Sequence, residues 1–196
     1  MKAPLIVVAC LWTAASACTG TKGASTSERE LRADIVNPAG VSMGTVKFSI
    51  GNDGHAGTDV TVEADIKGLL PAGTFHGMHI HANNDPAGGG GCIAPTFASA
   101  GGHLSAAGDV HGKHMGDLPM LLARVDGTAR YHFVTDRFRL ADLTGAVVIV
   151  HALADNYNNV PRGSNPDEYT ANSPAAVTLT DDTGNSGDRI GCGTIK

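Results

Sequence analysis

Apolar and polar residues alternate with a period of two in several short stretches of this chain. The clearest stretch is 59–67, where apolar residues at 60, 62, 64 and 66 alternate with Thr, Glu, Asp and Lys. Successive side chains of a strand point to opposite faces, so this alternation predicts a strand with one buried face. Similar patterns and short apolar runs predict eight strands, at 31–36, 44–50, 59–67, 75–81, 119–125, 128–135, 146–151 and 189–195.

Turn signals favour an antiparallel arrangement of these strands. Asp126-Gly127 separates the fifth and sixth predicted strands and predicts a two-residue hairpin turn, in which both central residues have positive φ. No stretch predicts an amphipathic helix longer than about two turns. The sequence therefore predicts an all-β antiparallel sandwich or barrel.

Two long segments interrupt the strands. Residues 82–118 follow the predicted strand that ends in His81, and residues 152–188 follow the one that ends in His151. Both segments far exceed the roughly 12–15 residues beyond which loops in a compact domain are usually functional or disordered. We therefore expect a site beneath two long functional loops, next to strand ends that carry histidine.

The N-terminus has the features of an export signal. Lys2 precedes a mostly apolar stretch, 3–15, that is too short to span a bilayer as a permanent helix. Ala-Ser-Ala before Cys18 resembles a bacterial lipobox, so we predict a signal peptide at 1–17 and lipidation of Cys18, with plain secretion as the alternative. Residues 18–33 then form the lipidated N-terminus and flexible tether, and residues 34–196 the folded domain.

Charge and cysteine usage agree with an exported domain. The net charge of −5 and the lack of a basic run argue against nucleic acid as a partner. We expect contact with a membrane only through the lipid anchor at Cys18. The expected location is the bacterial cell envelope outside the cytoplasm, either in the periplasm or at the outer cell surface. Once Cys10 is removed and Cys18 acylated, Cys92 and Cys192 remain, and we predict that they form a disulfide.

Histidines gather in and next to the first long segment. His79 and His81 are two residues apart, so a strand would place both imidazoles on one face, and imidazole nitrogen suits copper and zinc. The alternative for this pair alone is two surface histidines. Three further histidines and a carboxylate occur within fifteen residues and form an acceptable tetrahedral zinc set, against the alternative of a solvated polar loop: His103, His111, His114 and Asp117.

Five stretches, in order, resemble the copper–zinc superoxide dismutase family over roughly residues 40–196. They are FHGMHIH at 75–81, SAGGH at 99–103, HMGDLP at 114–119, VVIVH at 147–151 and TGNSGDRIGC at 183–192. The resemblance implies an eight-stranded Greek-key β-barrel that binds one copper and one zinc. It also implies an enzyme that converts superoxide to O2 and hydrogen peroxide by Cu(II)/Cu(I) cycling, and it leaves a homodimer open.

The resemblance also implies a role for individual residues. The implied copper ligands are His79, His81, His103 and His151, and the implied zinc ligands are His103, His111, His114 and Asp117. His103 would bridge the two metals and take part in proton transfer, and Arg189 would dock superoxide. Asp155 would hydrogen-bond one copper-side and one zinc-side histidine, and His76 would be a buried histidine next to the ligands. Cys92 and Cys192 would form the family disulfide.

The chain departs from the family at the zinc loop. Only two residues separate His111 from His114, where most family members have a longer excursion. The shortened loop leaves a copper-only dismutase open. A non-catalytic copper-binding lipoprotein and a secreted β-sandwich adhesion module are the rival functions; the first should lack Arg189 or part of the four-histidine set, and the second should be indifferent to chelators.

Overall fold

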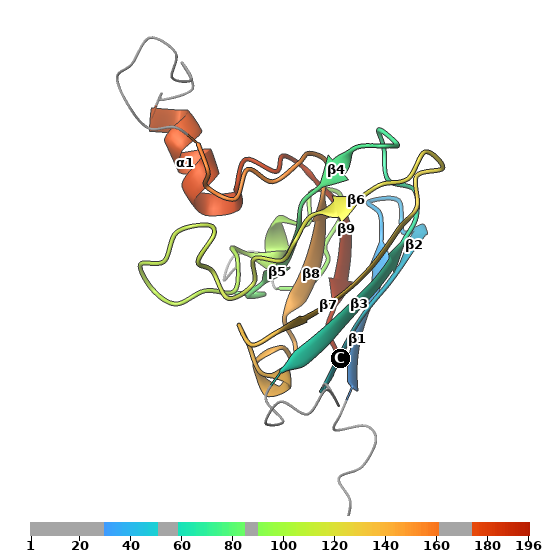
Figure 1. Cartoon of the computed structure of the whole chain (residues 1–196), viewed down its shortest axis with the longest axis horizontal. Helices are drawn as coiled ribbons and strands as arrows, with labels where there is room; N and C mark the ends of the chain where they lie inside the picture. The colour runs from blue at the N-terminus through green and yellow to red at the C-terminus, as the bar shows by residue number, and fades with distance from the viewer. Residues whose placement is uncertain (1–29, 51–58, 85–89, 161–173) are drawn as a thin grey trace, which may run out of the picture.

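The computed structural model describes residues 30–50, 59–84, 90–160 and 174–196 (Figure 1). The predicted signal peptide, Cys18 and most of the predicted tether lie outside these residues. Within them are nine strands and one α-helix: β1 Glu30–Val36, β2 Ser42–Ile50, β3 Val60–Ile66, β4 Phe75–His76, β5 Met78–His81, β6 Leu121–Leu122, β7 Ala129–Thr135, β8 Val147–His151, α1 Pro174–Thr183 and β9 Arg189–Thr194. β1 thus begins inside the predicted tether.

Seven strands form one curled antiparallel sheet in the order β5-β8-β9-β1-β2-β3-β7, and β4 and β6 form a second, two-stranded sheet (Figure 1). The sheet curls around its buried apolar face as a half-barrel, which confirms the predicted antiparallel all-β class. The alternation predicted in 59–67 is also confirmed, because Val60, Val62, Ala64 and Ile66 are buried in the core.

The predicted strand 75–81 is in fact two strands that separate at Gly77. β4 pairs with β6, whereas β5 pairs with β8. The Gly77 amide donates to the Leu153 carbonyl and its carbonyl accepts from the His151 amide. A Cβ on Gly77 would lie 2.7 Å from Ser186 Oγ, so glycine permits the close approach at which the chain leaves one sheet for the other.

The turn after β6 differs from the predicted two-residue hairpin. Arg124 and Thr128 close it, with the Arg124 amide donating to the Thr128 carbonyl, and only Gly127 has a positive φ, of 75°. Asp126 Oδ1 accepts from both the amide and the hydroxyl of Thr128. A side-chain acceptor therefore stabilises a wider turn, and the prediction of positive φ at Asp126 was wrong.

The helix α1 was not expected from the sequence. It lies in the second long segment, away from the curled sheet (Figure 1). Thr180 is buried, and the Asp181 carbonyl accepts from the His111 amide, so α1 contacts the first long segment. Among the described helices, none combines the length and hydrophobicity needed to cross a membrane.

Strands β5 and β8 are buried on both faces, and this places the histidines. Met78 and Ile80 of β5 lie in the main core, so His79 and His81 point to the outer face of the sheet. In β8 the register is broken between Val150 and His151, and such a bulge re-aims the side chain that follows it. The outer face under the long segments is therefore where the three strand histidines meet.

The segment 103–117 packs along the edge of β5. Isolated bridges join His81 to His103 and His79 to Asp117. The Ile80 amide donates to the Gly116 carbonyl, and the Ile80 carbonyl accepts from the Leu104 amide, both at 2.8 Å. The first long segment therefore hydrogen-bonds along the edge of β5 and covers the histidines of that strand.

Candidate metal centre

The first cluster combines four buried imidazoles from three parts of the chain. Two lie on β5, one in the first long segment and one at the end of β8: His79, His81, His103 and His151. One ring nitrogen from each lies within 4.8 Å of the others. These are the four predicted copper ligands, and the fold brings all of them together.

One nitrogen of each of these rings is buried without a hydrogen-bond partner. The atoms are His79 Nδ1, His81 Nε2, His103 Nε2 and His151 Nε2. An unsatisfied buried nitrogen is costly, and four converging ones form a donor set that suits copper. The residues therefore fit the metal that the sequence predicts.

The opposite nitrogens of the strand histidines are held in place. His81 Nδ1 donates to the Gly101 carbonyl at 2.8 Å and His151 Nδ1 to the Gly187 carbonyl at 3.0 Å. A carbonyl only accepts, so each bond fixes the tautomer that leaves Nε2 free to bind a metal.

The second cluster has the shape of a tetrahedral site. Asp117 Oδ1 lies 2.8 Å from His103 Nδ1, 3.0 Å from His111 Nδ1 and 3.3 Å from His114 Nδ1. His103 Nδ1 and His114 Nδ1 are 3.1 Å apart. Ligands bound tetrahedrally to zinc at about 2.0 Å stand about 3.3 Å from one another, so the four atoms fit zinc closely. His103 belongs to both clusters, offering Nε2 to the first and Nδ1 to the second.

Asp155 connects the two clusters from behind. Its buried carboxylate accepts from His79 Nε2 through Oδ2 and from His111 Nε2 through Oδ1, each at 2.8 Å. The Tyr157 amide donates to Oδ1 at 2.6 Å. A Cβ on Gly184 would overlap Asp155 Oδ1, and its φ of +62° also favours glycine. Asp155 therefore bonds one histidine of each set, as the resemblance implies, and it occupies a space that Gly184 leaves open.

Arg189 lies beside the copper set. Its Nη1 donates to the Phe97 carbonyl at 2.6 Å and its Nη2 to the Gly101 carbonyl at 2.7 Å. The Gly101 carbonyl is also the acceptor for His81 Nδ1. One backbone oxygen thus connects the guanidinium to a copper-set histidine.

The disulfide anchors the segment that provides these carbonyls. Cys92 and Cys192 are bonded, as predicted, and β9 carries both Cys192 and Arg189. A small apolar cluster of Phe97, Ala100, Val147, Ile149 and Cys192 packs beneath the segment. The predicted supporting residue His76 is buried, and its Nδ1 donates to the His151 carbonyl at 3.0 Å.

Burial and charge set the protonation of the metal-free clusters. Burial lowers the pKa of His103 to about 4 and that of His151 to about 3, so both rings are neutral and ready to bind metal at pH 7. Burial also opposes a charge on His111, but its contacts with Asp117 and Asp155 outweigh this and raise its pKa to about 9. The carboxyl of Asp155, against the effect of its burial, has its pKa lowered to about 2 by His111 and His79.

Sequence reasoning missed the parts of the site that are backbone. The carbonyls of Phe97 and Gly101 orient Arg189, but a carbonyl is present at every residue and leaves no signal in the sequence. Gly184 belongs to the motif at 183–192, and a glycine there could have suggested a close approach of another side chain to the backbone, which is that of Asp155.

Two buried ligand sets that share one imidazole, built on a curled antiparallel sheet, define a protein with a paired copper and zinc centre. A family model described as copper/zinc superoxide dismutase (SODC) matches residues 42–195. The chain belongs to the copper/zinc superoxide dismutase family, and this homology together with the two clusters makes it a superoxide dismutase enzyme.

Proteins of similar sequence and similar structure agree with this family assignment. The chain is 37% identical over 203 residues to a Cu-Zn superoxide dismutase of Mycobacterium tuberculosis, covering 94% of this chain and 79% of that protein. It is 34% identical over 199 residues to one of Mycolicibacterium paratuberculosis, covering 94% and 83%. The solved Cu/Zn superoxide dismutase of Brucella abortus superposes with a TM-score of 0.59 at 26% identity, covering 85% of this chain and 99% of that one.

The metal-free chain should lose stability as the pH falls from 6.5 to about 4. His103 stays neutral in the fold, whereas in the unfolded chain it takes up a proton near its ordinary pKa of 6.5. The unfolded state then binds more protons, which lowers the free energy of unfolding by on the order of 3 kcal/mol for His103 alone. His111, with its raised pKa, is protonated in both states in this range and does not oppose the trend. Thermal melts with a chelator measure it, and a constant unfolding temperature would contradict it.

Cys192→Ser should loosen the segment 92–101 while the sheet still forms. The crosslink closes a loop with a sequence separation of 100, and removing a native disulfide typically costs about 2–5 kcal/mol. We expect a lower unfolding temperature and faster metal loss, with an unchanged far-ultraviolet spectrum. The wild type under a thiol reductant is the control and should behave alike. Metal retention equal to that of the oxidised wild type would show that the crosslink does not support the centre.

Proposed function

We propose that this chain converts superoxide to O2 and hydrogen peroxide as an exported protein held at a membrane by a lipid on Cys18. The observation that carries the catalytic part is the set of four unpartnered, buried nitrogens that converge from β5, the first long segment and β8. When bound there, copper supplies the redox chemistry by passing between Cu(II) and Cu(I) as one superoxide is oxidised and the next reduced.

Arg189 is proposed to dock superoxide. Its side chain is partly exposed, and two carbonyls hold its guanidinium next to His81. A fixed cation beside the reacting centre attracts the anion and needs no rearrangement when the substrate arrives.

His103 is proposed to move a proton. Its Nδ1 faces Asp117 and the zinc set, and its Nε2 faces the copper set. In the proposed cycle Nε2 takes up a proton from solvent when the first superoxide is oxidised and gives it to the peroxide formed from the second, and solvent supplies the other proton of hydrogen peroxide. Zinc ligation at Nδ1 would keep the ring in place during both steps.

Superoxide consumption by the purified chain, with both metals counted in the same sample, tests the catalytic proposal. We expect fast dismutation with one copper and one zinc bound. Arg189→Ala should keep both metals and lose at least about tenfold in rate, because the steering charge is gone. Activity with copper alone would reject the zinc assignment but keep the enzyme. Bound copper without activity would favour a non-catalytic copper-binding lipoprotein.

Export and anchoring rest on the sequence of residues 1–18. In cells given labelled fatty acid, the wild type should carry the label and collect in the membrane fraction. Cys18→Ala should lose both properties, whereas the matched control Cys10→Ala should keep both because Cys10 lies in the part that is removed. An unlabelled wild type in the soluble exported fraction would support plain secretion instead. The homodimer stays a prediction, which sedimentation of the purified chain would test.

A further inference from the structure

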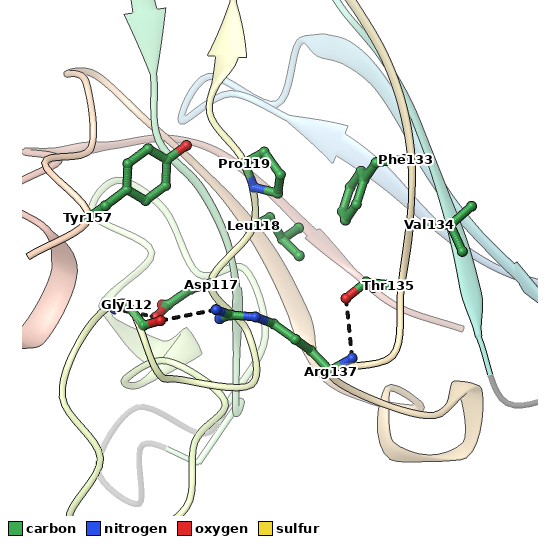
Figure 2. Close-up of a pocket in the computed structure, with 9 residues that line it drawn as sticks. All are labelled: Gly112, Asp117, Leu118, Pro119, Phe133, Val134, Thr135, Arg137 and Tyr157. Carbon is green, nitrogen blue, oxygen red and sulfur yellow. Dashed lines mark hydrogen bonds between the residues drawn. The ribbon is translucent and has the colours of Figure 1, made fainter.

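An arginine from outside the metal-binding segment bonds to two backbone carbonyls of the turn that carries the zinc set. Arg137 follows β7, and its guanidinium reaches back to the first long segment (Figure 2). Nη1 donates to the His114 carbonyl at 2.9 Å and Nη2 to the Gly112 carbonyl at 3.0 Å. The two arms of one guanidinium therefore contact two alternate residues of the turn 111–117.

The same two residues are held from the other side by a zinc-set ligand. Asp117 Oδ2 accepts from the Gly112 amide at 2.6 Å and from the His114 amide at 3.0 Å. Gly112 and His114 thus give their amides to Asp117 and their carbonyls to Arg137. This arrangement fixes the peptide planes on both sides of the turn, and with them the position of the His114 ring.

The turn has little structure of its own. Residues 103–117 contain no helix or strand, although all of them are described. Gly112 has a φ of +89°, and a Cβ there would lie 3.0 Å from the Tyr157 carbonyl, so the backbone bends sharply at this point. With only two residues between His111 and His114, bonds from elsewhere must hold the bend.

A cavity separates the turn from β7. It has a volume of about 460 Å³ and lies between Gly112 and Asp117 on one side and Phe133–Thr135 on the other (Figure 2). Among the described residues, no side chain fills this space, so packing does not press the turn toward the sheet there. Arg137 spans the gap, and its own amide donates to Thr135 Oγ1 at 3.2 Å, which fixes the start of the arm.

We infer that Arg137 is a positioning residue for the zinc site, replacing the support that a longer loop would give. Its planar fork matches two carbonyls at once, which a lysine ammonium on a flexible stem cannot do. The inference rests on the proposed zinc site but not on dismutation, because the two guanidinium bonds of Arg137 go to the turn that carries zinc ligands.

Zinc affinity of the full chain, measured by competition with a chromophoric chelator, is the test. Arg137→Ala should bind zinc roughly tenfold or more weakly, since loss of a group that orients ligands typically costs about 10–100-fold. Arg137→Lys should fall between the two. Copper affinity should change less than about threefold, because the copper set receives no bond from Arg137.

A matched control separates position from charge. Arg130 lies in β7, is exposed as Arg137 is, and pairs with Asp65 at 3.1 Å; within the described part of the chain it makes no bond to the turn. Arg130→Ala removes the same charge and should bind zinc as the wild type does. With Co(II) in place of zinc, Arg137→Ala should also shift the visible d–d absorption, because the ligands are no longer held in the same geometry.

The outcomes that overturn the inference are distinct. Zinc affinity and a Co(II) spectrum unchanged in Arg137→Ala would overturn it, whatever the unfolding temperature. An equal loss of zinc affinity in Arg130→Ala, or an equal loss of copper affinity in Arg137→Ala, would assign the effect to charge or to general loosening. A wild type that binds no zinc would remove the zinc assignment itself, and this result is seen before any variant is compared.

Discussion

One buried carboxylate determines how both metal sites are arranged. Asp155 binds the Nε2 of His79 and the Nε2 of His111, each at 2.8 Å. Because each ring uses Nε2 toward the carboxylate, each presents Nδ1 to its own cluster. A single side chain from the second long segment thus orients a copper-set ring on β5 and a zinc-set ring in the first segment. The space for it exists because residue 184 is glycine.

The same carboxylate gives the metal-free zinc set its charge balance. With a pKa raised to about 9, His111 is protonated at pH 7 and lies between the carboxylates of Asp117 and Asp155. In the metal-free protein, the positive charge of the His111 imidazole therefore balances the two carboxylates, as a zinc ion would. Zinc must displace a proton from His111 to bind, so binding releases a proton and weakens as the pH falls.

Local patterns predicted what depends on neighbours in sequence. Alternation along a strand was enough to place His79 and His81 on one face, and the family motifs assigned the remaining ligands correctly to their clusters. The break at Gly77 was not predictable in this way, because it depends on Ser186 and Leu153, which are distant in the chain. The role of Arg137 was not predictable either, because its partners are backbone carbonyls of residues that are distant in the chain.

The helix α1 was missed because its signals are at its ends. Pro174 at the first helical position and Gly184 after the last residue are ordinary start and stop signals. The helix itself is rich in threonine and has no continuous apolar stripe, so periodicity gave no indication of it. Contacts of Thr180 with Asn156 and of Asp181 with His111 hold it in place instead.

The disulfide and the copper set form a continuous series of contacts. The bond between Cys92 and Cys192 ties the segment 92–101 to β9, and β9 also carries Arg189. The carbonyl of Gly101 then receives hydrogen bonds from both Arg189 and His81. Loosening this segment would thus move a positive charge and a copper-set ring together. Where the disulfide persists, the crosslink keeps both in register. Under reducing conditions the Arg189 guanidinium and the His81 ring would lose the same anchor at once.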